Sequence, residues 1–201
     1  MARYTGPTNK LFRNHGVKEL SNRKLVSSMK QTPSGQHGAT RKKLSEYAIH
    51  LKEKQKIRLT YLVSEKQFAK YYHAAARKKG VTGTILLQML ESRLDNVLFK
   101  SGFGITRRQS RQIVTHGHVL VNGKKVDIPS YSVKSGDVIT VKAKSSDFVK
   151  KSVIDLIDMP CNPAWMTIDK AALKITFDRI PEREELDPEI KEQLVIEYYS
   201  K

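Results

Sequence analysis

The sequence predicts an α+β fold in which a helical domain is followed by a small antiparallel sheet. Two observations support this prediction. Apolar residues recur with helical spacing from about residue 45 to 116, and the spacing then changes to an alternation of apolar and polar residues. An Asn122-Gly123 pair separates two short apolar stretches, which is typical of a tight hairpin. With 39% hydrophobic residues, the chain can also bury a core.

Residues 1–44 are expected to form an extended basic arm. Gly6-Pro7, Pro33 and Gly38 interrupt any periodicity in this segment, and basic side chains recur along its whole length. By itself such a segment should be poorly ordered. Segments of this kind can fold onto a partner and wrap a large surface, so we expect the arm to follow a binding partner.

Two helices are expected after the arm, over residues 45–61 and 64–79. Ser64 and Gln67 have the spacing of a capping box at the start of the second helix, and Gly80 would end that helix. The second helix also carries a stripe at positions i, i+3, i+4 and i+7, which we interpret as core rather than as a platform for bases. The stripe consists of Phe68, Tyr71, Tyr72 and Ala75.

A third helix is expected from about residue 82 to Lys100, ended by Gly102. Glu91 and Asp95 lie one turn apart on it. A pair of carboxylates could serve a hydrolytic or metal site, but no His or Cys near them has a ligand spacing. We therefore expect Asp95 to pair with a nearby arginine and Glu91 to be solvated.

Residues 104–126 combine a basic helix with the hairpin. Thr106 is expected to cap a helix over residues 106–116, Gln109 to return a hydrogen bond to the cap backbone, and Gly117 to end the helix. The hairpin strands are expected over residues 118–121 and 124–128.

Three arginines stand in the first turns of this helix. Positive charge at a helix N-terminus opposes the macrodipole unless an anion compensates it, and phosphate is such an anion. Arginine also binds phosphate in a bidentate manner and stacks on bases, which lysine does not do. We predict that the helix start and the hairpin form one RNA-binding edge. The arginines are Arg107, Arg108 and Arg111.

Further strand residues are expected at Val133 and over residues 138–141, then over 164–169 and 172–177, with Trp165 as a packing anchor. An acidic, turn-rich connection over residues 181–190 and a short apolar terminal element follow. The predicted domains are the arm at 1–44, a helical domain at 45–91 joined by the C-terminal segment 178–201, and a module with the sheet at 92–177.

The charge of the chain favours a nucleic-acid partner. Lys and Arg number 37 against 20 Asp and Glu, which gives a formal net charge of +17. Residues 155–201 are acidic, so the basic surplus lies in the rest of the chain. No lipidation signal and no apolar stretch of about 18 residues is evident, so we expect a soluble, unsecreted protein and no membrane partner.

No residue set for catalysis or cofactor binding is evident. Cys161 is the single cysteine, which excludes an intramolecular disulfide and a multi-cysteine zinc site, and we interpret it as a small apolar filler. His116 and His118 form an incomplete metal site because no third ligand is near. The chain has neither a P-loop nor a Gly-x-Ser-x-Gly elbow. We expect no enzyme, no metal and no cofactor.

Taken in order, several motifs resemble the family of the universal small-subunit ribosomal protein S-four, in its bacterial or organellar form, over essentially the whole chain. The motifs are Ala2–Pro7, Gly35–Gly38, Glu53–Lys56 with Tyr61, Glu65–Phe68, Leu90–Asn96, Arg111-Gln112, His116–His118, Val121–Gly123, Ile128–Tyr131, Gly136-Asp137 and Glu197–Ser200. Two features depart from the family. The arm lacks the zinc-binding cysteine cluster that some relatives carry, and Asn14-His15 stands where consecutive arginines are frequent.

The resemblance implies an RNA-binding module in which a helix-turn-helix packs on the β-sheet. It also implies a structural role in the small ribosomal subunit, where the protein would bind the 5′ domain of the small-subunit (16S-type) ribosomal RNA at a multi-helix junction and nucleate assembly of the subunit body. Ribosomal proteins S-five and S-twelve would be neighbours, at sites that affect translational accuracy. In bacteria, the family commonly represses its own messenger RNA. The location implied is the cytoplasmic ribosome, or the plastid stroma for an organellar chain.

The RNA-binding residues that we predict from the basic pattern and the resemblance lie in the arm, the helices and the hairpin. They are Arg3, Tyr4, Lys10, Arg13, Gln36, His37, Arg41, Lys54, Lys56, Arg58, Lys66, Arg107, Arg108, Arg111, His116, His118, Asn122, Lys124 and Lys125. Two other functions are considered. An RNA-modifying enzyme with the same module would need a catalytic domain for which residues 1–90 leave little room. A stand-alone RNA-binding factor acting on ribosomes would leave the arm and the helical domain unexplained.

Overall fold

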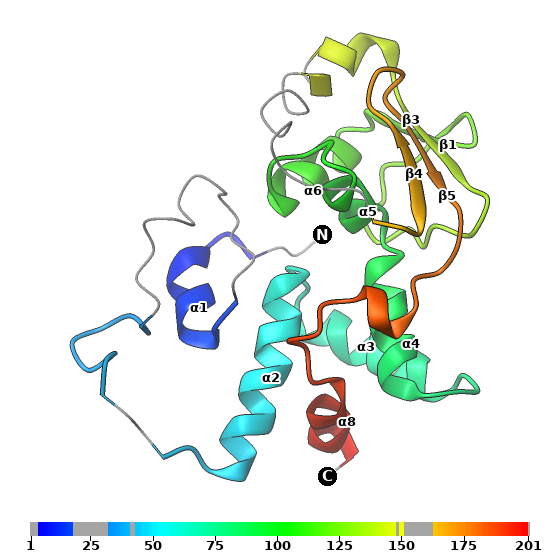
Figure 1. Cartoon of the computed structure of the whole chain (residues 1–201). Coiled ribbons are helices and arrows are strands. Elements are labelled where there is room, and N and C mark those ends of the chain that lie inside the picture. Colours follow the sequence, from blue (N-terminus) through cyan, green and yellow to red (C-terminus); the bar gives the residue numbers. More distant parts are fainter. Residues whose placement is uncertain (1–3, 18–31, 41–42, 148, 151–162, 201) are drawn as a thin grey trace. The chain divides into compact units, whose positions relative to one another are not determined.

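The computed structural model describes residues 4–17, 32–40, 43–147, 149–150 and 163–200 (Figure 1). It confirms the predicted α+β class. The chain forms two compact units, one of Met1–Leu87 with Asp187–Lys201 and one of Gln88–Leu186. We refer to them as unit 1 and unit 2. Cys161, Arg3 and Arg41 lie outside the described residues.

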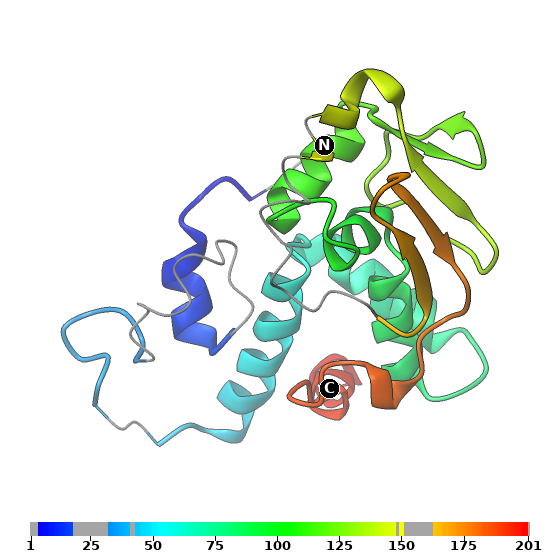
Figure 2. The same cartoon turned by 45° about the horizontal axis from the view of Figure 1, so that its top comes forward.

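Unit 1 is built around the long helix α2 (Glu46–Thr60). The other helices of this unit are α1 (Thr8–His15), α3 (Glu65–Ala76), the first part of α4 (Thr82–Glu91) and α8 (Glu192–Ser200). Both α1 and α8 pack along α2, and they lie on opposite sides of it (Figures 1 and 2). Segments from both ends of the chain therefore hold α2. The apolar terminal element expected at residues 193–199 is helical.

Helix α1 lies inside the basic arm, where the sequence analysis predicted no helix. Phe12 is only 2% exposed and packs in a small cluster with Val17 and Leu59. Gly16 ends the helix in the left-handed conformation with φ 69°, and its N–H donates to the carbonyl of Phe12. Three apolar side chains are too few to show as a periodic pattern, but they suffice to dock one short helix on α2.

Helices α2 and α3 lie where they were expected, but only α2 has a side-chain cap at its start. The Ser45 hydroxyl caps α2 by accepting from the Ala48 N–H at 3.3 Å. Ser64 makes no side-chain cap bond, so the predicted capping box at α3 is wrong, and the helix ends at Ala76 rather than residue 79. The aromatic stripe is core, as predicted, with Phe68 fully buried.

The predicted third helix is two helices, α4 and α5 (Leu94–Lys100), because the chain is extended at Arg93 with φ −67° and ψ 136°. Arg93 forms a β-bridge with Ser132. The neighbouring Leu94 N–H donates to the Tyr131 carbonyl at 2.9 Å. Backbone groups that pair with a distant segment are not available to a continuous helix, which is why periodicity alone gave the wrong prediction here.

Unit 2 contains an antiparallel sheet of five strands in the order β2-β1-β3-β5-β4. The strands are β1 (Val119–Val121), β2 (Lys124–Lys125), β3 (Val138–Val141), β4 (Met166–Asp169) and β5 (Lys174–Phe177). Asn122 and Gly123 have φ 50° and 78°, as a type I′ turn requires, so the predicted hairpin is confirmed.

The core of unit 2 joins α5 and α6 (Arg107–Thr115) to the sheet. Leu98 and Ile113 from the helices share one buried cluster with Ile139 and Ile175 from the strands. Trp165 is 5% exposed and belongs to the same cluster, as predicted. Unit 2 also contains the short 3-10 helices η2 (Ala143–Ser145) and η3 (Arg183–Glu185). None of the helices that the structure describes is long and apolar enough to span a membrane.

Candidate nucleic-acid interface

The start of α6 is held by two reciprocal hydrogen bonds. The Thr106 hydroxyl accepts from the Gln109 N–H at 3.1 Å, which confirms the predicted cap. The Gln109 side chain accepts from the Ile105 N–H at 2.8 Å, one residue earlier than expected. At the other end, Gly117 has φ 70° and the His118 N–H reaches back to the Ile113 carbonyl at 3.2 Å. The helix thus has fixed ends, and its side chains have fixed directions.

The three arginines of α6 face three different surroundings. The Arg107 guanidinium is buried over the Phe99 ring, 4.3 Å from its centroid, and donates to the Asn96 side chain at 3.2 Å. Arg111 lies 3.4 Å from the Asp95 carboxylate. Arg108 is exposed. Asp95 of unit 2 therefore supplies part of the negative charge that balances the arginines at the helix start. Arg108 is the arginine that faces solvent.

A buried ion pair lies beneath these arginines. Arg93 donates to both carboxylate oxygens of Asp95, at 3.0 and 2.7 Å, and both side chains are less than 10% exposed. The expected pairing of Asp95 with arginine is confirmed. The expectation for Glu91 is wrong, because Glu91 is 4% exposed and accepts from the Asn96 side chain at 2.6 Å. The break between α4 and α5 brings Asn96 against Glu91 in the interior.

Three segments that carry basic residues lie side by side at the hairpin. The His118 ring and the Ser145 hydroxyl are 2.7 Å apart, and the Lys142 N–H donates to the His118 carbonyl at 2.9 Å. The Lys125 stem lies over Gly117, where a Cβ would come within 2.3 Å of the Lys125 Cε. We call this group the hairpin edge. It comprises His116, His118, Lys124, Lys125, Lys142 and Lys144.

Sequence reasoning missed two members of the hairpin edge, Lys142 and Lys144. The signal in the sequence was only a pair of lysines after a strand, which is usually a solvated face. They join the edge because β1 pairs with β3 in register, so the residues after β3 lie beside the residue before β1. This placement depends on strand pairing and not on any local pattern.

Asn122 has a structural partner on each side of its amide. Its NH2 group donates to Asp137 at 2.8 Å, and its oxygen accepts from the Val138 N–H at 2.9 Å. These bonds tie the hairpin turn to the start of β3. Asn122 therefore fixes the position of the adjacent lysines.

In unit 1, several predicted RNA-binding cations have partners within the protein. Lys54 is 4% exposed, and its ammonium lies 2.8 Å from Glu65 and 4.4 Å from the centre of the Tyr198 ring. The Lys56 ammonium donates to the Glu189 carbonyl at 2.9 Å. Both cations join α2 to other segments of unit 1. Because Lys54 is buried, its ammonium is not accessible to RNA.

The Glu65 carboxyl accepts hydrogen bonds from both Lys54 and Tyr199. Partial burial raises its pKa, but the hydrogen bonds from Lys54 and Tyr199 and the charges of Lys54 and Arg58 outweigh the burial, so the pKa is lowered. The Tyr199 hydroxyl donates to Glu65 at 2.8 Å. Burial, together with that hydrogen bond, raises the pKa of Tyr199 well above its ordinary value. At neutral pH, the Glu65 carboxyl is therefore ionised and the Tyr199 hydroxyl keeps its proton.

Two residues of α1 hold the loop at 32–40. The Arg13 guanidinium donates twice to the Thr32 carbonyl, at 3.0 and 2.9 Å. The Asn14 side-chain oxygen accepts from both the N–H and the hydroxyl of Ser34 at 2.8 Å. Asn14, which stands where the family frequently has an arginine, therefore anchors the 32–40 loop. The other predicted cations and polar residues of unit 1 that the structure describes lie at its surface: Tyr4, Lys10, Gln36, His37 and Lys66 are exposed and Arg58 is half-buried.

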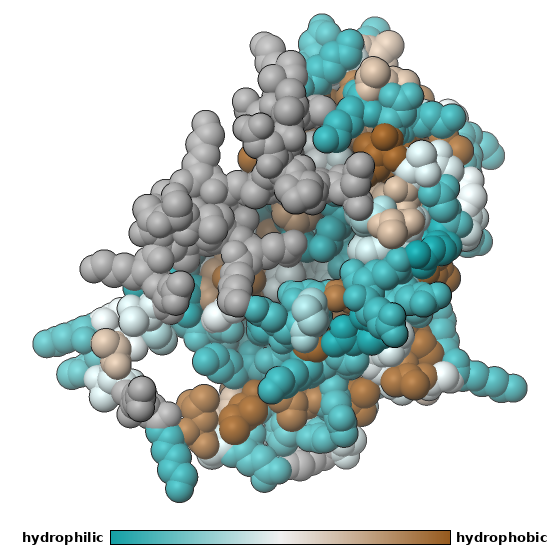
Figure 3. All heavy atoms as spheres, viewed as in Figure 1, coloured by the Kyte–Doolittle hydropathy of each residue, from teal (hydrophilic) through white to brown (hydrophobic). Residues whose placement is uncertain are grey.

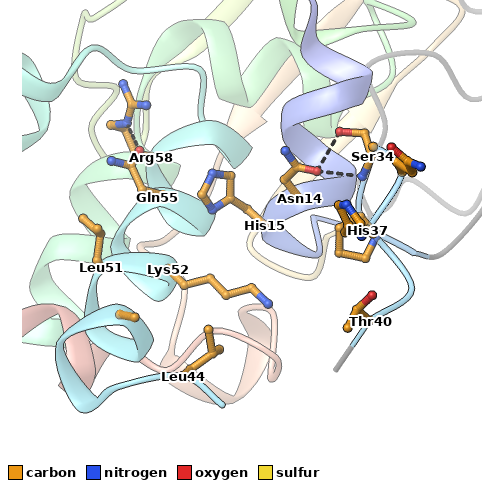
Figure 4. Close-up of a pocket in the computed structure, with 15 residues that line it drawn as sticks. Asn14, His15, Ser34, His37, Thr40, Leu44, Leu51, Lys52, Gln55 and Arg58 are labelled. Atoms are coloured by element: carbon orange, nitrogen blue, oxygen red, sulfur yellow. Dashed lines mark hydrogen bonds between the residues drawn. The ribbon is translucent and has the colours of Figure 1, made fainter. Parts of the chain in front are cut away.

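A hollow of about 890 Å³ lies between α1, the 32–40 loop and α2 (Figure 4). His15 points from α1 toward α2, and Lys52 extends from α2 toward the loop. Burial, and after it the charges of Lys52 and Arg58, lower the pKa of the His15 imidazole. The sequence analysis did not single out this hollow, because its walls come from three separate segments.

The described surface is mostly hydrophilic and carries no cluster of metal-ligating side chains. In the view of Figure 3, hydrophilic residues make up most of the coloured surface. Among the described residues, no group of three or more His, Cys, Asp or Glu side chains could hold a metal ion. The His116 and His118 rings lie 5.8 Å apart at their centroids.

Comparisons with known proteins match the whole chain. A model of the ribosomal protein S4/S9 N-terminal domain matches residues 3–91, and a model of the S4 domain matches residues 92–139. The chain is 50% identical over 206 residues to small ribosomal subunit protein uS4 of Laribacter hongkongensis and 48% identical over 207 residues to uS4A of Symbiobacterium thermophilum. It is 45% identical over 205 residues to uS4 of Mesomycoplasma hyopneumoniae. Each alignment covers 100% of both chains.

Proposed function

The chain belongs to the uS4 family of small ribosomal subunit proteins, and on this premise we propose that it is a structural component of the small ribosomal subunit that binds ribosomal RNA. The observation that carries the proposal is the hairpin edge, because four of its six basic residues lie within residues 92–139, the segment that the S4 domain model matches. The family consists of structural ribosomal proteins and not of enzymes, so the RNA-modifying enzyme is not favoured. The stand-alone factor is not favoured either, since the relatives match over their full length.

The exposed basic residues support a contact made mainly with the RNA backbone. Lysine and arginine side chains on a surface bind phosphates without reading base sequence. In unit 2, we propose contacts from Arg108 and the hairpin edge, with Arg107, Arg111 and Asn122 positioning them. In unit 1, the proposed contacts, including two from outside the described residues, are Arg3, Tyr4, Lys10, Gln36, His37, Arg41, Arg58 and Lys66. Arg13 and Lys56 would act by holding the loop and α2.

The finer parts of the function rest on the family resemblance. We propose that the RNA site is a multi-helix junction in the 5′ domain and that binding nucleates assembly of the subunit body. The proposed neighbours are ribosomal proteins S-five and S-twelve, at sites that affect decoding accuracy. The proposed location is the cytoplasmic ribosome, or the plastid stroma for an organellar chain, and the protein's own messenger RNA is a second proposed RNA target.

The salt dependence of RNA binding tests the proposal. Each phosphate that a cation neutralises releases counterions, so the affinity for a 5′-domain RNA fragment should fall steeply with salt, with a log-log slope of several units. Filter binding or fluorescence anisotropy between about 50 and 200 mM salt would measure this slope. A salt-insensitive interaction would contradict the proposal.

A matched pair of double variants tests the hairpin edge. Changing Lys124 and Lys125 together to Ala should weaken binding by roughly ten-fold and lower the slope by about 2. The control changes the exposed Lys170 and Lys174, which lie at and beside the β4–β5 turn, toward the other edge of the same sheet. Equal losses in both double variants would mean that only net charge matters and that the hairpin edge is not the contact.

A further inference from the structure

We propose that the hollow between α1, the 32–40 loop and α2 receives one unpaired nucleotide of the bound RNA, with its phosphate on Lys52 and its base between the loop and α2. The inference rests on the proposed RNA-binding function and adds a defined site to it. Ribosomal RNA presents such nucleotides at junctions and bulges, where proteins stack on unpaired bases and bind their polar edges.

The walls of the hollow are held in place by contacts within unit 1. Phe12 and Leu59 dock α1 on α2, and Arg13 and Asn14 fix the loop to α1. The loop is also tight, because a Cβ at residue 38 would lie 2.0 Å from the carbonyl oxygen of residue 33. A site with fixed walls loses less conformational entropy when it takes up a ligand.

The charge of the hollow favours an anion. Its lining includes Lys52, Arg58 and two histidines, His15 and His37, and no carboxylate is among the described residues that line it. Arg58 is partly compensated by Glu65, at 3.6 Å. No described residue forms an ion pair with Lys52, which leaves its exposed ammonium available to a phosphate.

The remaining lining suits a base. Pro33, Leu44 and Leu51 supply apolar surface. The Gln36 amide supplies a donor and an acceptor for base edges, and Gln55 supplies its NH2 group, because its oxygen already accepts from the Arg58 Nε–H at 2.8 Å. A volume of about 890 Å³ lies within the range of small-molecule sites, about 300–1,000 Å³. The mixture of apolar walls and amides distinguishes this hollow from a site for inorganic phosphate alone.

His15 supplies an independent observation. Its Nδ1 atom is buried and has no hydrogen-bond partner among the described residues. Buried polar atoms in folded proteins nearly always have a partner, so an imidazole nitrogen beside Lys52 and Arg58 without one indicates a missing ligand. A bound nucleotide would supply both an anion for the two cations and a hydrogen-bonding group for His15.

Filling the hollow tests the inference without removing charge. Ala48 lines the hollow, and the Ala48→Phe variant would occupy the space of a base. We expect it to weaken binding of the 5′-domain RNA fragment about ten-fold, a loss comparable to that of one stacked base. Ala76→Phe, at the exposed end of α3, is the control for the same change in helix propensity and should bind as the unmodified protein does. Circular dichroism melts would establish that both variants fold.

A charge variant and a nucleotide probe complete the test. Lys52→Ala should lose more affinity than Lys70→Ala, which removes an exposed cation on α3 outside the hollow. Millimolar uridine 5′-monophosphate should shift the His15 ring signals in NMR spectra and raise the His15 pKa in the unmodified protein, and should do neither in Ala48→Phe.

The outcomes separate this inference from the proposed function. If the unmodified protein binds RNA with a steep salt slope and Ala48→Phe binds equally well, the nucleotide site is overturned and the RNA-binding function stands. If inorganic phosphate gives the same His15 shifts as the nucleotide, and these persist in Ala48→Phe, the hollow is an anion site only and the inference fails. If the unmodified protein shows no salt-dependent RNA affinity, the proposed function itself fails.

Discussion

The two units use positive charge in different ways. In unit 1, α2 is tied to distant segments through its cations: Lys54 contacts Glu65 and Tyr198, and Lys56 contacts the Glu189 carbonyl. In unit 2, one apolar cluster joins the helices to the sheet, and most lysines of the hairpin edge lie at the surface. A basic sequence is therefore not equivalent to a basic surface, because part of the surplus charge holds the fold together.

The largest effect on stability is expected at the Arg93–Asp95 pair, where unit 2 also uses a buried cation to hold its fold together. Asp95→Ala should lower the free energy of unfolding by about 3–5 kcal/mol, because it leaves a buried guanidinium without that carboxylate. Urea unfolding followed by circular dichroism would measure the change. Asp127→Ala, at an exposed site of the same unit, is the control, and equal midpoints for the two variants would contradict the prediction.

In unit 1, Phe12→Ala should release α1 from α2. Truncating a buried Phe to Ala typically lowers the free energy of unfolding by about 3–5 kcal/mol. Because α1 can detach locally without unfolding of the rest of unit 1, the free energy of global unfolding should fall by only about 2 kcal/mol. Hydrogen exchange should show that α1 amides lose protection while those of unit 2 keep theirs. Leu11→Ala, at the half-buried neighbour, should have a smaller effect, and unchanged α1 protection in Phe12→Ala would show that the cluster does not hold the helix.

A pH dependence of about 1 kcal/mol is expected for unit 1, reduced by the partial exposure of Glu65. The pKa of Glu65 is lower in the folded state than in the unfolded state. Its contribution is therefore present above the unfolded pKa, near 4.3, and is lost as the pH falls through the folded pKa. Unfolding of Glu65→Gln between pH 3 and 7 should show a flatter profile, and an unchanged profile would exclude Glu65 as its source.

The smallest effect is expected for the exposed Arg108 in unit 2. Arg108→Ala should lower RNA affinity by roughly three-fold and the log-log salt slope by about 1, with no change in the melting temperature. Arg107→Ala should instead lower the melting temperature, because its guanidinium is buried over Phe99. Identical behaviour of the two variants would remove the distinction between structural and surface arginines in α6.

Much of the fold could be predicted from local patterns. Thr106, Gly117 and the Asn122-Gly123 turn each fix a local conformation through one or two residues, and the structure has all three as expected. Helix α1 and the break at Arg93 were missed because a three-residue apolar cluster and the β-bridge to Ser132 create them. These contacts join residues far apart in the chain, which periodicity does not report.

The candidate site was predicted only in part, because it too depends on contacts between residues far apart in the chain. The sequence identified the basic helix start and the hairpin, but it did not separate exposed Arg108 from buried Arg107, nor exposed Lys66 from buried Lys54. Lys142, Lys144 and the hollow beside His15 appear only when separate segments come together.

By itself, the sequence determined the α+β class, the Thr106 cap, the hairpin turn, the basic character and the family, because each depends on residue type and short spacing. Only the tertiary structure decided which cations face solvent. A lysine or arginine stem is long enough to reach either water or a partner inside the protein. The choice depends on whether folding brings a carboxylate, a carbonyl or an aromatic ring within reach, as it does for Lys54, Lys56 and Arg107.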